Sequence, residues 1–350
     1  MNAADLKKDK YLTYIMEETE KLLSIDSPTG YTKKVTEYVC RAYREMGFEA
    51  KMTVKGGILA DLGGEDKENA ILLEAHVDTL GAMVAEVKKN GRLKLTPLGG
   101  LNPNNAEAEN CSVITRDGRR YEGTFQMENA SIHVNGEYDD TRRGYEAMEL
   151  VLDEKVYTKE ETINLGIMPG DIVAFDPRTR MTESGYIKSR FLDDKLSVGI
   201  LLGMAKYMKD KNSKPARRIY HHITVYEEVG HGACGTVPEG VTEILSVDMG
   251  CVGEGLGCSE HQVSICAKDS RGPYSYDVVG ALIEAAKKAK ADFAVDVYPH
   301  YGSDADAALS AGYDVRHGLI GAGVYASHGY ERSHIDGVKN TFDLLKAYLL

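Results

Sequence analysis

Strand-like apolar runs alternate with helix-like patterns in two parts of the chain. Between these parts lies a segment with a different sequence pattern. Before residue 83 and after residue 183, apolar residues recur at helical spacing and then in short continuous runs. Strands that alternate with helices predict a mostly parallel sheet flanked by helices. We therefore expect an α/β domain formed from residues 1–82 and 184–350.

The predicted elements of this α/β domain follow from the apolar spacing and from Gly and Pro breaks. The helix that starts near Asp193 looks amphipathic, with Leu196, Ile200 and Met204 on one face. The expected helices cover residues 12–23, 35–46, 193–209, 274–290, 305–311 and 338–349, and the expected strands cover 48–54, 58–62, 70–73, 219–226, 244–247, 293–297 and 315–320.

Residues 83–183 alternate short strand-like pieces with turns rich in Gly, Asn, Pro and charged residues. This pattern of short strands and turns predicts a β-rich, barrel-like domain inserted into the α/β domain. A helix is possible only near 145–153, and the expected strands cover 82–87, 93–97, 131–134 and 171–175.

Composition restricts the classes of partner. The 350 residues carry a net charge of −12, which disfavours a nucleic-acid partner because phosphate binding needs clustered Lys and Arg. The first ten residues lack the apolar core of a secretory signal, and no apolar run approaches the ~20 residues of a membrane span. The six cysteines are scattered without a Cys-x-x-Cys pair, which favours reduced thiols. We therefore expect a cytoplasmic protein with no membrane partner.

Four polar clusters begin or end the apolar segments, and a histidine lies near the C-terminus. In a parallel sheet the carboxyl ends of the strands meet at one edge, where ligands bind. The clusters can therefore converge although they are far apart in the sequence. They are His76-Val77-Asp78, Asp193-Asp194, Glu227-Glu228, Val247-Asp248 and His334.

Two imidazoles and three carboxylates from these clusters form a nitrogen and oxygen donor set that suits Zn²⁺, Co²⁺ or Mn²⁺. A carboxylate that bridges two such ions holds them about 3.5–4 Å apart, as in two-metal hydrolases, and Asp193 could be that bridge. Adjacent side chains on a strand point opposite ways, so one of Glu227 and Glu228 can bind a metal while the other faces a water. Asp78 can accept a hydrogen bond from His76 and fix its tautomer.

This ordered set resembles peptidase family M42, the TET and glutamyl aminopeptidase family. The likeness is strongest in Leu73–Gly81, Phe191–Gly199, Val225–Gly235 and Leu245–Asp248. The resemblance implies a metal-dependent aminopeptidase that holds two divalent ions, zinc first, with cobalt or manganese as alternatives. The implied ligands are His76, Asp193 and Asp248 for one ion and Asp193, Glu228 and His334 for the other.

The resemblance also assigns supporting roles. Glu227 would be the general base, Asp78 would orient His76, and the Asp193–Asp194 peptide would be cis. The β-rich insert would be a dimerisation domain, and dimers would build a homo-oligomer that admits peptide substrates, with a tetrahedral dodecamer as one form of assembly.

Several positions depart from the family pattern. Thr79, Lys195 and Ile335 replace the residues that usually follow the three motifs, which leaves the preferred N-terminal residue open. His328 is an alternative to His334 as the last ligand, and we favour His334 because of its distance from the C-terminus and the helix that follows.

Other polar residues have more ordinary interpretations. Tyr301–Asp304 resembles a family loop and is interpreted as a helix cap near the site. His221 and His222 are interpreted as structural. His133 and His231 stay open, and His231 could line a substrate pocket.

Other functions fit parts of the pattern. A related two-metal amidohydrolase, of the deacetylase or carboxypeptidase type, shares the ligands, but its inserted domain precedes the final His, whereas here the long gap separates His76 from Asp193. A glycoside hydrolase needs two carboxyl groups about 5–9.5 Å apart across the bond, which adjacent glutamates do not offer directly. A non-catalytic scaffold would not need the complete ligand set.

Overall fold

The computed structural model describes residues 1–350, apart from the side chain of Ala3. The chain forms two compact units, one from Met1–Asp78 with Arg178–Leu350 and the other from Thr79–Pro177. The insert predicted from sequence begins four residues later than this second unit (83 against 79) and ends six residues later (183 against 177).

A twelve-stranded sheet forms the centre of the first unit. Its middle strands run parallel in the order β12-β3-β13-β17, while β2 and β1 at one edge and β18, β11 and β10 at the other are antiparallel additions. The α/β fold class is therefore confirmed, with a sheet that is parallel at its centre and mixed at its edges. The strands are β1 (Glu49–Met52), β2 (Ile58–Gly63), β3 (Asp66–His76), β10 (Arg180–Met181), β11 (Tyr186–Ser189), β12 (Arg217–Thr224), β13 (Val241–Val247), β14 (Gly250–Val252), β15 (Val263–Lys268), β16 (Phe293–Val297), β17 (Arg316–Tyr325) and β18 (Glu331–His334).

Strand β3 shows why the central strands appear in the sequence as continuous apolar runs. Every residue from Ala70 to His76 is buried, because helices or loops cover both faces of a parallel sheet. The strand therefore extends beyond the predicted residues 70–73 and carries His76 to its carboxyl end.

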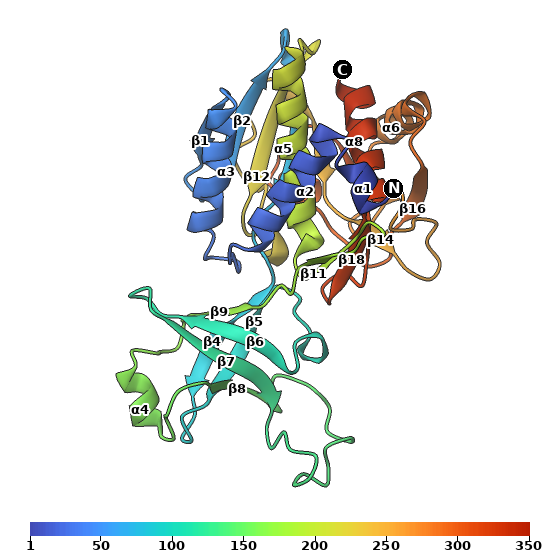
Figure 1. Ribbon diagram of the computed structural model, residues 1–350. Helices are drawn as coiled ribbons and strands as arrows, with labels where there is room; N and C mark the ends of the chain where they lie inside the picture. The colour runs from blue at the N-terminus through green and yellow to red at the C-terminus, as the bar shows by residue number, and fades with distance from the viewer. The chain divides into compact units, whose positions relative to one another are not determined.

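Helices α2, α5 and α8 lie together on one face of this sheet (Figure 1). Residues Leu192–Ala205 of α5 are all buried, so this is a core helix and the predicted amphipathic pattern is wrong. Helix α2 packs closely on α5, because Gly199 and Gly203 leave room for Thr19 and Ile15. The helices of the unit are α1 (Ala3–Leu6), α2 (Lys10–Leu23), α3 (Lys33–Glu45), α5 (Leu192–Lys211), α6 (Tyr276–Ala289), α7 (Asp304–Ser310) and α8 (Ile335–Leu349), with the 3-10 turn η2 (Glu227–Val229).

The second unit is a closed six-stranded barrel in the order β4-β5-β8-β7-β6-β9, with antiparallel pairs. The predicted β-rich, barrel-like insert is thus present. The possible helix at 145–153 is wrong, since Met148–Leu152 is a strand, and residues 131–134 form turns rather than a strand. The elements are β4 (Gly81–Val87), β5 (Leu93–Leu98), η1 (Pro103–Asn105), β6 (Glu109–Ile114), β7 (Arg120–Met127), β8 (Met148–Leu152), α4 (Lys159–Asn164) and β9 (Ile172–Phe175).

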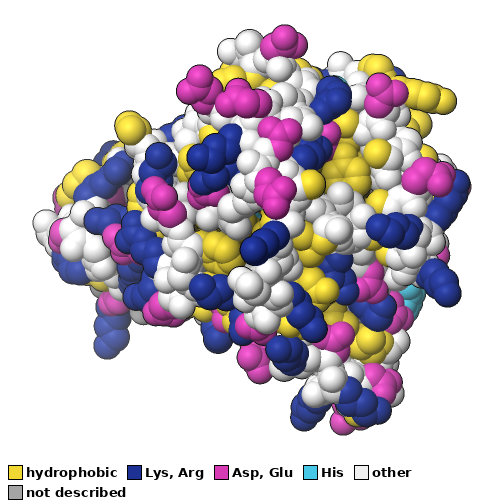
Figure 2. Space-filling model, turned by 90° about the horizontal axis from the view of Figure 1, so that it is seen from above, with side chains coloured by type: hydrophobic (Ala, Val, Ile, Leu, Met, Phe, Trp, Pro, Cys, Tyr) yellow, Lys and Arg dark blue, Asp and Glu magenta, His cyan; other side chains and the backbone are white. Residues whose placement is uncertain are grey.

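Charged side chains of both signs intermingle on the face of the molecule shown in Figure 2, with apolar side chains scattered between them. The net charge of −12 is therefore not gathered into one acidic area of this face. Among the described residues, no helix is both long enough and apolar enough to span a bilayer.

Candidate metal centre

The polar clusters predicted from sequence meet at the carboxyl edge of the parallel strands. His76 ends β3, Asp193 lies at the start of α5, and the Asp193–Asp194 peptide is cis, as expected. The remaining members of this cluster come from the segments that follow strands: Glu227 and Glu228 after β12, Asp248 after β13, and His328 between β17 and β18.

Two groups of donor atoms share Asp193. In the first group, His76 Nε2 lies 3.1 Å from Asp193 Oδ1, and Asp248 completes a set whose ligand atoms all lie within 4.8 Å of one another. In the second, His328 Nε2 lies 3.5 Å from Asp193 Oδ2 and 3.6 Å from Glu228 Oε2. The two oxygens of one carboxylate thus face two separate sets of donors.

His334 does not join this cluster, and the preference for it over His328 needs correction. His334 Nε2 donates to Ser184 O at 2.9 Å, and Nδ1 accepts the Asp336 N–H at 3.0 Å. Both nitrogens are engaged because His334 ends β18 and caps the N-terminus of α8. His328, which has a positive φ of 60° in the connection before β18, takes the position next to Asp193.

The side chains of Glu227 and Glu228 point to different partners, but not because they alternate along a strand, as was predicted. Strand β12 ends at Thr224, and the two glutamates lie in the 3-10 turn η2 rather than at a strand end. Glu228 faces His328, whereas Glu227 Oε2 lies 3.7 Å from His76 Nε2. Glu227 belongs to neither of the two donor groups.

The Asp78 carboxylate hydrogen-bonds to the turn that carries Glu227 and Glu228, and it lies farther from His76. Its Oδ1 accepts the Glu227 N–H at 3.1 Å, and its Oδ2 accepts the Thr29 hydroxyl at 2.8 Å and the Glu228 N–H at 3.4 Å. His76 Nδ1 lies 2.9 Å from the backbone oxygen of Asp78 but 3.6 Å from its carboxylate. The backbone carbonyl is therefore the closer partner of the imidazole.

Glu331 is a site residue that the sequence analysis missed. Its two carboxylate oxygens accept the Asp193 N–H at 3.1 Å and the His328 N–H at 3.0 Å. Burial, reinforced by the charge of Asp193, raises the pKa of Glu331 to about 8. This carboxyl group ties the start of α5 to the loop that carries His328.

Several carboxyl groups share this buried cluster, and burial disfavours their charged forms. Burial raises the pKa of Asp248 to about 7 and raises the pKa values of Glu227 and Glu228 well above their usual range, with neighbouring carboxylates adding to the effect. Burial would also raise the pKa of Asp193, but hydrogen bonds from His328 and His76 lower it instead.

The donor set fits divalent cations. Glu228 Oε1 is buried and has no hydrogen-bond partner among the described residues, as expected for an atom that faces a cation. Imidazole nitrogens and carboxylate oxygens are the donors that zinc, cobalt and manganese accept.

A cavity of about 630 Å³ opens over the cluster. Besides Asp193, Glu227 and Asp248 it is lined by Arg271 and by the segment His300–Asp304. Ser303 caps α7 there, as the sequence pattern predicted.

The four other histidines that the sequence analysis considered lie outside the cluster. His221 and His222 are buried in β12 against Tyr43 and Glu74, at 2.9 Å and 3.0 Å. His231 is exposed and stacks on Tyr226, and His133 is exposed in the barrel unit.

Comparison with known proteins decides the family. The model of the M42 glutamyl aminopeptidase family matches residues 56–344. The chain belongs to this family. It is 43% identical over 334 residues to a Bacillus subtilis protein named "Putative aminopeptidase YhfE", covering 95% of this chain and 96% of that protein. It is 25% identical over 219 residues to the glutamyl aminopeptidase of Lactococcus lactis, with 62% and 60% coverage.

Solved structures share the fold. An aminopeptidase from Desulfurococcus kamchatkensis superposes with a TM-score of 0.86 at 22% identity, over 97% of this chain and 95% of that one. The TET1 peptidase of Pyrococcus horikoshii, described as assembling into a tetrahedron or a large octahedral shell, gives 0.84 at 22% identity, over 96% and 99%. Family and relatives together make this chain a hydrolase, an aminopeptidase.

Proposed function

We propose that the chain is a dinuclear metallo-aminopeptidase that removes N-terminal residues from peptides. One cation would be held by His76, Asp193 and Asp248, and the other by Asp193, Glu228 and His328. The observation that supports this most directly is that the two oxygens of Asp193 face different donor groups, at 3.1 Å and 3.5 Å from the two imidazoles. We propose zinc as the first choice of metal, with cobalt or manganese as alternatives.

A pair of divalent cations in such a site supplies Lewis acidity for the scissile carbonyl and lowers the pKa of water towards neutrality. Glu227 would accept the proton of the attacking water and then donate it to the leaving amino group. Its position supports this role, because it lines the cavity and lies beside His76 without belonging to either donor group.

Two other carboxylates would act through the backbone. Asp78 would hold Glu227 and Glu228 by accepting their amide N–H groups. Glu331 would hold Asp193 and His328 in the same way. Such outer contacts commonly fix the orientation of metal ligands.

We further propose a cytoplasmic homo-oligomer. All six cysteines carry free thiols, which fits a reducing compartment. The dodecameric and tetrahedral assemblies of the structural neighbours support an oligomer. The barrel unit would contribute to its subunit contacts.

A related amidohydrolase that acts on N-acyl amino acids is the second candidate. The position of the barrel unit, between His76 and Asp193, favours the aminopeptidase. Parallel assays with aminoacyl chromogenic amides and with N-acetylated amino acids separate the two, since an aminopeptidase needs a free N-terminal amine. Release of acetate without release of N-terminal residues would favour the second candidate.

The test of the general base is Glu227→Gln, which keeps the size of the side chain and removes its basicity. We expect kcat to fall by about 10²–10⁴-fold, the usual contribution of a general base. Metal content by inductively coupled plasma mass spectrometry should equal that of the wild type. Glu239→Gln, at an exposed glutamate, is the matched control and should be fully active. Wild-type kcat in Glu227→Gln would remove Glu227 from this role.

A further inference from the structure

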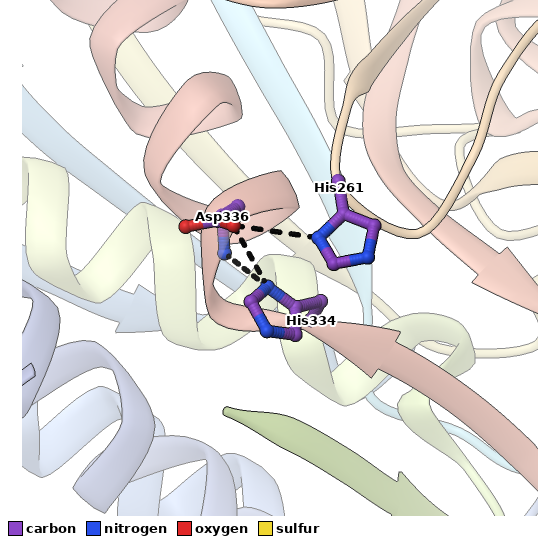
Figure 3. Close-up of side chains that lie close together, drawn as sticks. All are labelled: His261, His334 and Asp336. Carbon is purple, nitrogen blue, oxygen red and sulfur yellow. Dashed lines mark hydrogen bonds and ion pairs between the residues drawn. The ribbon is translucent and has the colours of Figure 1, made fainter. Parts of the chain in front are cut away.

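His334, which the candidate centre does not use, belongs to a second cluster of metal-binding side chains. It meets His261, from the connection between β14 and β15, and Asp336, in the first turn of α8. Figure 3 shows both imidazole rings turned towards Asp336. The ligand atoms of these three residues all lie within 4.8 Å of one another.

The distances are close to those between ligand atoms within a zinc coordination sphere. Asp336 Oδ2 lies 3.3 Å from His261 Nδ1 and 3.2 Å from His334 Nδ1. Ligand atoms about 2.0–2.2 Å from a tetrahedral zinc lie about 3.3–3.6 Å from one another. Two imidazole nitrogens and one carboxylate oxygen are also a usual three-ligand set, with water in the fourth position.

In both rings the Nε2 atom, which points away from Asp336, has a hydrogen-bond partner. Such a partner can leave the lone pair on the Nδ1 atom that faces Asp336. His334 Nε2 donates to Ser184 O at 2.9 Å, so its Nδ1 carries a lone pair, which accepts the Asp336 N–H at 3.0 Å. His261 Nε2 lies 3.1 Å from the Tyr186 hydroxyl, which can accept its N–H. Engagement of the second ring nitrogen is typical of histidines that bind metals.

One oxygen of Asp336 already has a positive partner, since the N-terminal ammonium of Met1 donates to Oδ1 at 2.7 Å, whereas Oδ2 faces the two imidazoles. The carboxylate Oδ2 of Asp336 and the Nδ1 of His334 are both acceptors, and they lie only 3.2 Å apart. A cation between them would relieve the repulsion of the two lone pairs, in exchange for the hydrogen bond from the Asp336 amide.

The cluster is both anchored and accessible. The Asn340 side chain of α8 donates to His261 O at 2.9 Å, which holds the loop next to the helix. The side chains of His261 and Asp336 are 41% and 31% exposed, whereas that of His334 is 3% exposed. A cation can therefore reach the site from solvent.

We infer that His261, His334 and Asp336 form a separate binding site for a zinc-class divalent cation that joins the β14–β15 connection to the start of α8. The inference does not depend on the proposed function, because the two clusters share no residue. The site would take no part in the proposed catalysis, since no residue of this cluster lines the catalytic cavity.

The test compares zinc content in the intact chain, prepared without a polyhistidine tag. Chelator-stripped protein is titrated with Zn²⁺ against a chromophoric chelator, and bound zinc is counted by mass spectrometry. We expect His261→Ala and Asp336→Asn each to bind one equivalent of Zn²⁺ fewer than the wild type, whatever number the catalytic cluster holds. His133→Ala, at an exposed histidine of the barrel unit, is the matched control and should bind as many as the wild type.

A second measurement identifies the ligands. Cobalt added to the stripped wild type should give an additional visible absorption band that His261→Ala lacks, while the kcat of this variant is unchanged. Equal zinc content in the wild type and His261→Ala, or an equal loss in His133→Ala, would overturn the inference and leave the cluster as a hydrogen-bonded network.

Discussion

His328 reaches Asp193 and Glu228 from an irregular connection, six residues before a second histidine that is used elsewhere. The backbone amide of His328 donates to Glu331, which also binds the Asp193 amide. The position of this histidine therefore depends on one buried carboxyl group and not on a strand end.

Substitution of the two histidines should have opposite consequences. His328→Ala should remove one metal equivalent and lower kcat/KM by at least about 100-fold, because a two-metal site loses one of its cations. His334→Gln should retain kcat/KM within a few-fold while lowering the free energy of unfolding by about 1–2 kcal/mol, since two hydrogen bonds of a buried side chain are altered. Steady-state kinetics measures kcat/KM of both variants, and denaturant unfolding measures their free energy of unfolding. An active His328→Ala with a folded but inactive His334→Gln would reverse the assignment.

Among the residues of the candidate site, those that belong to a short polar motif beside an apolar run could be predicted from the sequence. His76, Asp193, Glu227 and Asp248 follow or begin apolar runs, which made their convergence predictable. Glu331 could not be found in this way, because a carboxylate that binds backbone amides can contact any residue type.

Helix α5 carries Asp193 and Lys195 at its buried start, and its packing on α2 supports that end of the sheet. A Cβ atom added to Gly203 would lie 2.2 Å from Ile15 Cγ1, so the two helices approach closely only because the residue is glycine. In α6, by contrast, a Cβ at Gly280 would meet nothing within 4 Å.

These two glycines form a matched pair of substitutions. Gly203→Ala should lower the free energy of unfolding by about 1–3 kcal/mol, because overpacking outweighs the higher helix propensity of alanine. Gly280→Ala should raise it by up to about 1 kcal/mol, because only the propensity changes. Equilibrium urea unfolding of both variants provides the comparison. Equal effects of the same sign would show that helix propensity, not contact with Ile15, decides the outcome.

Whole elements were predictable where the apolar spacing was uninterrupted. Strand β16 has the predicted bounds, Phe293–Val297, whereas β6 and β7 were missed. Their hairpin carries a usual turn signal, Asp117-Gly118 with φ of 85° at the glycine, but charged and small residues interrupt the alternation on either side. Barrel strands of this kind depend on pairing with their neighbours, which short patterns do not record.

At the scale of the whole molecule, the barrel unit carries two exposed apolar side chains on one irregular segment. The irregular segment 128–147 joins β7 to β8 and carries Ile132 and Val134, which are 61% and 74% exposed. Long connections without regular structure are usually either functional loops or linkers. In the proposed homo-oligomer, contact with another copy of the chain would cover these side chains.

The oligomer can be tested through this segment. Light scattering should give a mass that is a multiple of 38.4 kDa for the wild type. Replacing both Ile132 and Val134 by Asp should shift the mass towards 38.4 kDa, because charges placed in an apolar contact must be desolvated. Val54→Asp, at a fully exposed turn of the other unit, is the control and should retain the wild-type mass. A monomeric wild type would contradict the proposed assembly, whereas an unchanged mass in the double variant would place the subunit contact elsewhere.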